Sequence, residues 1–266
     1  MSMHWDEAFP IIRLNGAGAK DFLQGQTTAD LRKTVHGRLQ QSCWLTASGR
    51  LRAVLELRLD DDGADVLVLA GDAYAMAQGL DQVIFPADRV RMGERRLQRR
   101  IQALRPDSPA AWIDDESSLP SEFAGSRRLL STELEERRLR LGFPPGPAEL
   151  TGNTNPFELG LAQCISLDKG CYLGQETMAK LAGRGGIKQQ LRCWVSSNRL
   201  NSGDPLFDGE TRAGVVTSIL ELESDSLVGL ALIRRQYLTS GALNGPNGQM
   251  VTLERPELFQ DPPSPD

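Results

Sequence analysis

The N-terminal third of the chain alternates apolar and polar positions in the manner of strands that lead into amphipathic helices. The apolar run 11–14 ends at the turn dipeptide Asn15-Gly16, and a helical spacing over 19–25 follows it. The stretch 40–59 alternates on both sides of a Ser-Gly turn at 48–49, which predicts a β-hairpin. This part of the chain therefore begins as a strand, a helix and a hairpin.

The pattern then continues with another strand and another helix. An apolar run over 66–70 precedes a helical pattern over 72–83, and a second helical pattern covers 129–141. The intervening stretch 106–126 is rich in Pro, Ser, Asp and Glu and predicts a loop. Strand pairs alternating with amphipathic helices favour an α+β fold over a helical bundle.

From Leu191 onward the chain consists of short apolar runs separated by Gly, Asp, Asn and Ser. The five runs LRCWVSS, DPLF, RAGVVTSIL, LVGLALI and MVTLER predict a small antiparallel β-barrel or sandwich. We therefore predict an α+β region over 1–186 and a β-barrel over 187–255. Four prolines in residues 256–266 predict a disordered tail.

Composition narrows the class of protein. The 266 residues carry 30 basic and 35 acidic side chains, a net charge of −5, with 40% hydrophobic residues. This balance is typical of a soluble globular protein and excludes a collagen-like or histone-like chain. No apolar run approaches the ~20 residues that span a bilayer. The N-terminus has neither the basic nor the apolar region of an export signal, so we expect a cytoplasmic protein, and a monomer since no heptad pattern is visible.

The stretch 89–105 concentrates seven arginines and one glutamate in an otherwise acidic protein. Such a stretch indicates either direct RNA binding or a solvated face of a strand or helix. It contains no aromatic residue on which bases could stack, which favours the solvated face.

With four cysteines and two histidines, the chain has few candidates for metal ligands or for a serine-histidine catalytic triad. The cysteines are too sparse for a disulfide framework and form no CxxC pair, so we expect neither a disulfide scaffold nor a structural zinc site. Cys171 differs from the other three because Gly170 and Gly174 bracket it and Lys169 lies two positions before it. A helical pattern follows at 175–181, and both the helix start and the lysine favour the thiolate. Cys171 and Lys169 are therefore the candidate catalytic residues.

The segment KGCYLGQE at 169–176 resembles the signature of the YgfZ-type folate-binding proteins, relatives of the glycine-cleavage T-protein, an aminomethyltransferase. Other landmarks of that family occur in the expected order. They are FLQGQTTAD at 22–30, the SGR turn with Ala53, Arg138 with Gly142 and Pro144, Pro156 with Glu158, and GVVTS at 214–218. The resemblance covers roughly residues 8–240.

The resemblance implies subdomains ringed around a central channel that binds tetrahydrofolate, with a C-terminal antiparallel β-barrel. It also implies a role in the assembly or repair of iron–sulfur proteins, including cluster enzymes that modify tRNA. Cys171 occupies the position of the family's motif cysteine. The expected partners are therefore iron–sulfur proteins or their assembly machinery.

Three positions depart from the related patterns. Lys180 stands where the family often has Arg, and Leu167 replaces a frequent Phe. Aminomethyltransferases carry a pterin-holding carboxylate where this chain has Arg140, and a cation cannot accept the pterin's N–H donors. The third departure counts against aminomethyl transfer.

Folate makes its own demands on a site: an acceptor for the pterin N–H edge, a flat wall, and cations for the glutamate tail. Gln26 is a candidate for lining the channel or fixing a helix end, as is Asp30. For Glu176, the sequence is as compatible with a role at the helix end as with contact to the ligand. For Tyr172, it is as compatible with packing in the core as with contact to the ligand. The candidate contacts to the pterin are Glu158, Tyr172, Gln175 and Glu176, and those to the tail are Arg138, Lys169 and Arg184.

Two functions remain open at this point. The first is a tetrahydrofolate-binding accessory protein for iron–sulfur cluster assembly or repair that affects tRNA modification. The alternative is a tetrahydrofolate-dependent aminomethyltransferase.

Overall fold

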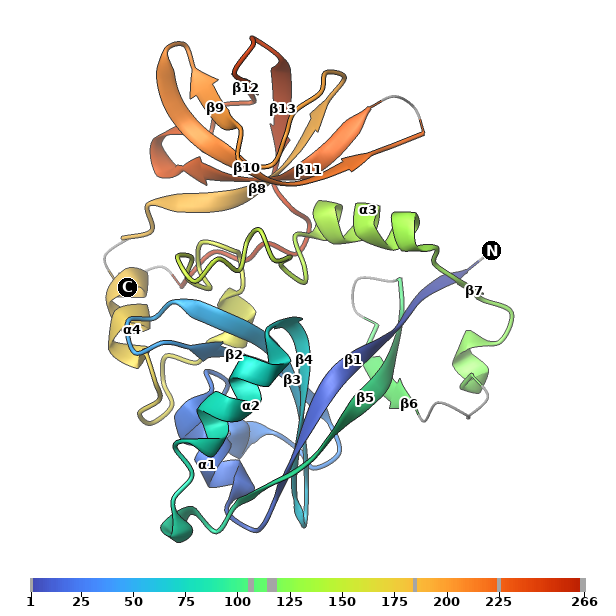
Figure 1. The fold of residues 1–266 in the computed structure, drawn as a ribbon, viewed down its shortest axis with the longest axis vertical. Helices are drawn as coiled ribbons and strands as arrows, with labels where there is room; N and C mark the ends of the chain where they lie inside the picture. The colour runs from blue at the N-terminus through green and yellow to red at the C-terminus, as the bar shows by residue number, and fades with distance from the viewer. Residues whose placement is uncertain (1, 105–107, 114–118, 184–185, 224–225, 264–266) are drawn as a thin grey trace. The chain divides into compact units, whose positions relative to one another are not determined.

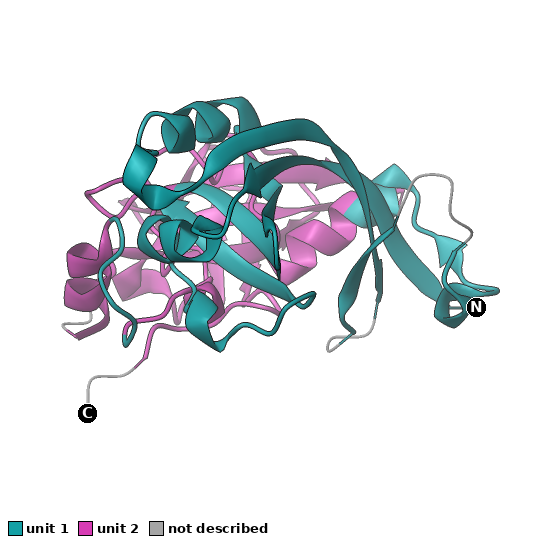
Figure 2. Ribbon diagram, turned by 90° about the horizontal axis from the view of Figure 1, so that it is seen from below, with its two compact units in different colours: residues 1–45, 52–134, 168–173 teal, residues 46–51, 135–167, 174–266 magenta. Residues whose placement is uncertain are grey.

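The computed structural model describes residues 2–104, 108–113, 119–183, 186–223 and 226–263. The chain forms two compact units, which Figure 2 shows in two colours. Unit 1 comprises 1–45, 52–134 and 168–173, and unit 2 comprises 46–51, 135–167 and 174–266. Each unit thus combines segments that are distant in the sequence.

Unit 1 is built on a mixed seven-stranded sheet in which β1 occupies a central place (Figure 1). The strand order is β2-β3-β4-β1-β5-β6, and β7 pairs with β1 in parallel. The strands are β1 (Met3–Asn15), β2 (Leu39–Leu45), β3 (Leu51–Asp60), β4 (Gly63–Gly71), β5 (Arg91–Ala103), β6 (Ala110–Ile113) and β7 (Arg127–Arg128).

The first strand, the hairpin and both early helices are confirmed. Helix α1 (Ala19–Gln26) follows β1, and α2 (Ala73–Asp81) follows β4. Asp72 caps α2, since its carboxylate accepts hydrogen bonds from the backbone N–H groups of Tyr74 and Ala75, both at 2.9 Å. The apolar faces of the two helices join one core with the sheet, to which α2 contributes Met76 and Leu80.

A buried ion pair shows that the sheet of unit 1 is strongly curled. Glu56 on β3 and Arg100 on β5 are 2% and 1% exposed, and the Arg100 Nε donates to Glu56 Oε1 at 3.0 Å. Three strand spacings separate β3 from β5, about 14 Å in a flat sheet. Trp112 on β6 completes the cluster, because its Nε1 donates to Glu56 Oε1 at 2.7 Å. The arginine stretch is therefore not only a solvated face: Arg100 is a core residue.

Unit 2 carries a closed antiparallel barrel, which confirms the barrel and makes the sandwich alternative wrong. The strand order around the barrel is β10-β11-β8-β13-β12-β9 (Figure 1). The strands are β8 (Gln189–Ser196), β9 (Pro205–Asp208), β10 (Thr211–Glu221), β11 (Leu227–Arg234), β12 (Ala242–Asn244) and β13 (Met250–Glu254). The sequence predicts five of these six strands and misses only the short β12.

Trp194 on β8 fills the barrel interior. Its ring is fully buried among Leu206, Val216 and Val251, and its Nε1 donates to the Leu230 carbonyl at 3.0 Å. Gly229 faces this ring, and a Cβ there would lie 2.5 Å from it and 2.1 Å from a backbone oxygen. Only glycine therefore fits opposite the tryptophan.

Two further elements of the chain lie outside the barrel. Helix α3 (Ser131–Leu141) confirms the helical pattern before the motif, and α4 (Gln175–Gly183) follows the motif. Short 3₁₀ turns occupy several of the connections. They are η1 (Leu31–Lys33), η2 (Pro86–Asp88), η3 (Ser121–Phe123), η4 (Ala162–Cys164) and η5 (Arg235–Tyr237).

Three predictions of organisation differ from the structure. The predicted loop 106–126 contains β6, which pairs with β5. In the predicted disordered tail, Phe259 is buried and the Gln260 N–H donates to the Gly160 carbonyl at 2.9 Å. The units also divide the chain differently from the predicted boundary at 186, because 46–51, 135–167 and 174–186 belong with the barrel.

Candidate functional site

The signature motif forms a loop followed by a helix, as the sequence predicts. Gly174 has a φ of +85°, a conformation that favours glycine, and α4 begins at the next residue. The motif is shared between the units: residues 168–173 belong to unit 1, and Gln175 and Glu176 belong to unit 2. Its side chains therefore belong to two different units.

Lys169 anchors the loop inside unit 1. Lys169 is 3% exposed, and its Nζ donates to the backbone carbonyls of Thr27 and Ala29 at 2.6 and 2.8 Å. Burial lowers the pKa of Lys169 to about 8, although the nearby Asp30 carboxylate opposes the shift. The ammonium also lies 5.0 Å from the centroid of the Tyr172 ring. These contacts make Lys169 a positioning residue for the loop.

The two residues after Gly170 point to different environments. Cys171 is exposed, whereas the other three cysteines of the chain are buried. Tyr172 is only 6% exposed, and burial raises its pKa to about 12. Its buried hydroxyl has no hydrogen-bond partner among the described residues. The loop therefore presents a thiol to solvent and holds the neighbouring ring inside unit 1.

Along the chain, Gln26 and Asp30 flank the segment whose carbonyls accept hydrogen bonds from Lys169. Gln26 is the half-buried last residue of α1. Asp30 caps the next 3₁₀ turn: its Oδ1 accepts from Arg32 N at 3.3 Å and from Gln24 Nε2 at 2.9 Å. The helix-end role thus accounts for the observed contacts of Asp30.

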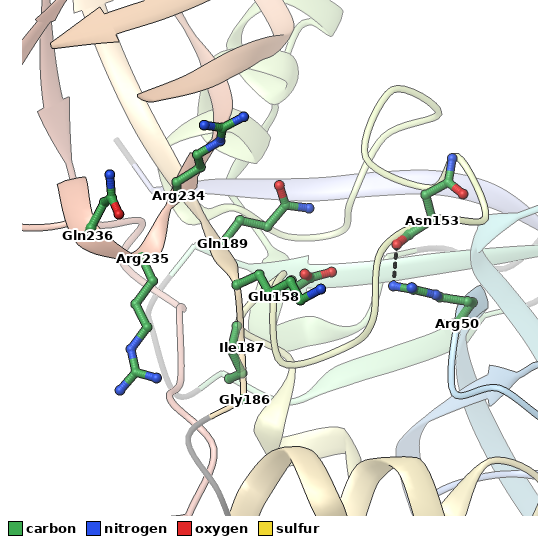
Figure 3. Close-up of a pocket in the computed structure, with 10 residues that line it drawn as sticks. Arg50, Asn153, Glu158, Gly186, Ile187, Gln189, Arg234, Arg235 and Gln236 are labelled. Carbon is green, nitrogen blue, oxygen red and sulfur yellow. Dashed lines mark hydrogen bonds between the residues drawn. The ribbon is translucent and has the colours of Figure 1, made fainter. Parts of the chain in front are cut away.

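Unit 2 contains a cavity of about 670 Å³, within the range of small-molecule sites (Figure 3). Four cationic side chains and three amide side chains surround a single carboxylate, that of Glu158. The cations are Arg50, Lys188, Arg234 and Arg235, and the amides are Asn153, Gln189 and Gln236. The cavity is thus suited to an anionic ligand that also carries a hydrogen-bond donor.

Glu158 is held rigidly at this cavity. It is 5% exposed, and its Oε2 accepts from the Asn155 backbone N–H at 3.0 Å, while Asn155 Oδ1 accepts from the Glu158 N–H at 3.1 Å. Burial raises the pKa of Glu158, against the opposing effects of the Asn155 N–H, Arg50, Gln189 and Lys188. The carboxylate is therefore a desolvated acceptor with positive charge nearby.

The hairpin turn brings Arg50 to the same cavity. Its Nη1 donates to the Asn153 carbonyl at 2.6 Å, a contact drawn in Figure 3. The turn depends on Gly49, whose φ is +73° and where a Cβ would approach the Thr177 side chain on α4 to 2.8 Å. The hairpin motif and the helix of the signature motif thus pack together within unit 2.

The barrel contributes the remaining cations. Gln189 opens β8 and is the strand partner of Arg234 at the end of β11. The Arg235 N–H donates to the Lys188 carbonyl at 2.9 Å, and the Leu191 N–H donates to the Glu158 carbonyl at 2.8 Å. Backbone pairing therefore sets the cations beside the carboxylate.

The other predicted folate contacts of unit 2 lie elsewhere. Although burial opposes it, Glu135 and Glu149 raise the pKa of Arg138, whose Nε donates to Glu135 at 2.7 Å. Glu149 also accepts from the Ser218 hydroxyl at 2.8 Å, so Arg138 belongs to a structural network. The Glu176 side chain is 84% exposed and pairs with Lys180 at 2.5 Å, which lowers its pKa.

Gln175 and Arg140 are not among the residues that line the cavity. Gln175 is the half-buried first residue of α4. Arg140, at the position of the transferase carboxylate, pairs with Glu136 at 2.7 Å. Arg184 lies outside the described residues.

Sequence reasoning singled out Glu158 but missed most of its neighbours. Arg50 stood in the quoted hairpin motif, which was a usable signal. Lys188, Arg234 and Arg235 sit at strand ends in no recognisable pattern, and only the strand pairing of the barrel brings them together.

The described residues contain neither a metal-binding cluster nor a helix that could span a bilayer. No group of three or more His, Cys, Asp or Glu side chains in that part of the chain could hold a metal ion. None of the helices described is both long and apolar enough to cross a bilayer.

No protein-family model matches the chain. A putative chloroplastic transferase of Arabidopsis thaliana is 33% identical over 161 residues, which cover 59% of this chain but only 37% of that protein. The chain thus spans well under two thirds of this relative's length. The tRNA-modifying protein YgfZ of Shigella dysenteriae is 26% identical, covering 82% of this chain and 81% of that one.

Among solved structures, the glycine cleavage system aminomethyltransferase T of Bartonella henselae superposes with a TM-score of 0.75 at 17% identity. The match covers 99% of this chain and 87% of that one. The predicted resemblance is therefore confirmed: the chain is similar in sequence to a YgfZ protein and has the fold of a T-protein.

Proposed function

We propose that the protein binds tetrahydrofolate and acts as an accessory factor in iron–sulfur cluster assembly or repair, so that it affects cluster-dependent tRNA modification. The observation that carries the folate part is the cavity of unit 2, where one buried carboxylate lies among four cations. The similarity to a tRNA-modifying YgfZ protein supports the second part. We expect the protein to act in the cytoplasm as a monomer.

The side chains of the cavity fit the chemistry of a reduced folate. Glu158 supplies an acceptor for the N–H edge of the pterin, and its burial strengthens such a hydrogen bond. Arg50 and Lys188 supply cations for the carboxylates of the glutamate tail. When bound, tetrahydrofolate carries one-carbon units on the nitrogens of its ring system, and the protein's residues hold and orient it.

Cys171 is the residue that we propose acts toward iron–sulfur proteins. A solvent-exposed thiol is accessible to a partner, and thiolates are the ligands that iron–sulfur clusters prefer. Lys169 acts through the loop, because its two hydrogen bonds to backbone carbonyls fix the segment that presents the cysteine.

The binding part is tested by calorimetric titration of the purified chain with tetrahydrofolate under anaerobic conditions. Glu158→Gln keeps the shape but removes the charged acceptor, and a hydrogen bond to a charged group contributes about 1.5–3 kcal/mol. We therefore expect roughly 10- to 100-fold weaker binding for this variant. Glu210→Gln, an exposed glutamate of unit 2 outside the cavity, is the matched control. Equal affinity for both variants would refute the assignment of Glu158.

The fold of an aminomethyltransferase also favours a second candidate, a tetrahydrofolate-dependent aminomethyltransferase. Arg140 argues against it, because it fills the position of a pterin-holding carboxylate and pairs with Glu136 instead. Incubation of the chain with an aminomethylated carrier protein and tetrahydrofolate distinguishes the two. Release of ammonia and formation of methylenetetrahydrofolate would support the transferase.

A further inference from the structure

The arginine stretch 89–105 of unit 1 divides into a paired part and an unpaired part. In the paired part, Arg99 donates to Asp6, and Arg100 donates to the buried Glu56. The unpaired part consists of four exposed guanidinium groups, none of which has a carboxylate partner in the part of the chain that the structure describes. They are Arg89, Arg91, Arg95 and Arg96.

Exposure alone does not account for the missing partners. Arg127 of the same unit is also exposed, and it pairs with Glu133 at 2.7 Å. The segment 89–96 contains only Glu94 against its four arginines and so keeps a net charge of +3. The fold thus leaves concentrated positive charge at this place.

Two exposed aromatic rings accompany these arginines, although the stretch itself contains none. Tyr74 on α2 is 61% exposed, and the Arg95 guanidinium lies 5.6 Å from the centroid of its ring. Phe85 is 65% exposed and directly precedes η2, the turn that leads to Arg89. Across the described ranges, no other Phe, Tyr or Trp side chain is exposed. The exposed rings and the unpaired arginines therefore occur together.

The path of the chain places the two rings at opposite ends of one surface. The chain runs along α2, turns at η2 and returns along β5 (Figure 1). The nine residues of α2 and the step from Arg91 to Arg95 each span about 13 Å. Tyr74 thus lies beside Arg95, and Phe85 lies at the turn next to Arg89. We refer to the two rings and the four unpaired arginines as the arginine–aromatic surface.

Cations combined with flat apolar rings are suited to a single-stranded nucleic acid. The guanidinium groups meet the phosphates, and each ring offers a face on which a base stacks. A duplex hides the faces of its bases, so the rings favour a single strand. The Tyr74 hydroxyl accepts from Gln78 Nε2 at 2.9 Å, which places two polar groups beside the ring for the 2′-hydroxyl of RNA.

An anionic membrane matches the surface less well. Asp81 and Gln82 are exposed between the two rings along the chain, so a membrane that took up both rings would desolvate these polar side chains.

We infer that the arginine–aromatic surface binds single-stranded RNA, with phosphates on the arginines and bases on Tyr74 and Phe85. This goes beyond the proposed function, which assigns the effect on tRNA to cluster enzymes, because it brings this chain itself into contact with RNA. The expectation of a solvated face rested on the absence of an aromatic residue within 89–105. The fold supplies the rings from α2 and the turn after it.

The test is fluorescence anisotropy of a labelled oligouridine RNA titrated with the full chain between about 50 and 200 mM salt. Four phosphate contacts predict a slope of about −2.8 for log K against log salt, and Arg95→Gln/Arg96→Gln reduces it to about −1.4. Tyr74→Ala and Phe85→Ala each weaken binding roughly fivefold or more and keep the slope.

The matched controls change similar side chains elsewhere in unit 1. Arg38→Gln/Arg128→Gln removes two exposed arginines, and Leu130→Ala truncates an exposed apolar side chain. Both keep the affinity and the slope of the wild type. Circular dichroism spectra confirm that all variants are folded.

The outcomes separate this inference from the proposed function. A wild type that does not bind at about 50 mM salt, or that binds with a flat salt dependence, overturns the inference. Equal losses in the surface variants and the controls overturn the assignment to these residues. Equal affinity for oligodeoxyuridine overturns the choice of RNA, and binding to phosphatidylserine vesicles without binding to RNA assigns the surface to a membrane. Tetrahydrofolate titration of the same variants tests the proposed function separately, because the cavity belongs to unit 2.

Discussion

Lys169 offers a quantitative test of the loop that carries Cys171. Burial lowers the pKa of Lys169 from its ordinary value of 10.5 to about 8 in the folded protein. Between these two values the unfolded chain binds a proton that the folded chain does not, so the free energy of unfolding rises with pH. The charged lysine thus lowers the free energy of unfolding below about pH 8, and this destabilisation decreases as the pH rises.

The expected size follows from the two pKa values. Integration of the proton-binding difference from pH 7.5 to pH 9.5 gives a rise of about 2 kcal/mol from this residue alone. The range ends below pH 10 because burial raises the pKa of Tyr172 from 10.0 to about 12. A tyrosine that stays protonated when folded lowers the stability with rising pH above 10, and would mask the lysine.

The assay is urea unfolding of the wild type and of Lys169→Met at several pH values between 7.5 and 9.5. Tryptophan fluorescence follows mainly unit 1, which holds Trp5, Trp44 and Trp112, three of the four tryptophans. The compared quantity is the slope with pH, since the substitution also removes two hydrogen bonds and so changes the absolute stability.

We expect the wild type to gain about 2 kcal/mol more than Lys169→Met over this range. Lys33→Met, which removes an exposed lysine of the same unit, should keep the wild-type slope. If the slope is identical in the wild type and in Lys169→Met, the assignment of Lys169 as a buried, charged anchor of the loop is refuted.

Three further predictions follow from the packing of the chain. Glu56→Gln leaves the buried Arg100 without its counter-charge and should lower the unfolding free energy by about 3–5 kcal/mol in urea titrations; a loss under 1 kcal/mol would contradict the buried pair. Iodoacetamide at pH 7.5 should modify the exposed Cys171 and should spare Cys193, because burial raises the pKa of Cys193 to about 11. Peptide mass spectrometry measures the labelling, and equal labelling of the two cysteines would disprove this prediction. Phe259→Ala should cost about 3 kcal/mol in thermal or urea unfolding, since the ring is buried; wild-type stability would restore the idea of a disordered tail.

The regular elements were predictable because their signals are local. The helix over 73–81 has an apolar stripe and an aspartate cap, and the hairpin has alternation around a glycine with positive φ. The barrel strands likewise alternate around turn residues, so their number was nearly right. The half-buried four-residue strand β6 was missed because it lies within a polar segment.

The candidate site was only partly predictable because it depends on contacts between distant segments. Glu158 was found through its motif, but the cations around it come from strand ends that meet only in the closed barrel. Lys169 was predicted to activate a thiol, and the structure adds its bonds to the Thr27 and Ala29 carbonyls, more than 100 residues away in sequence. Neither arrangement leaves a periodic trace in the sequence.

The central claim is tested most directly by the activity of a 4Fe–4S enzyme that methylthiolates tRNA, measured in cells that lack this protein. The cells are supplied with the wild type, with Cys171→Ala, or with Leu173→Ala, a change at a partly exposed side chain of the same loop. The account predicts that the deletion lowers the activity and that the wild type and Leu173→Ala restore it, whereas Cys171→Ala does not at equal protein abundance. Full activity in the deletion, or full rescue by Cys171→Ala, would contradict it.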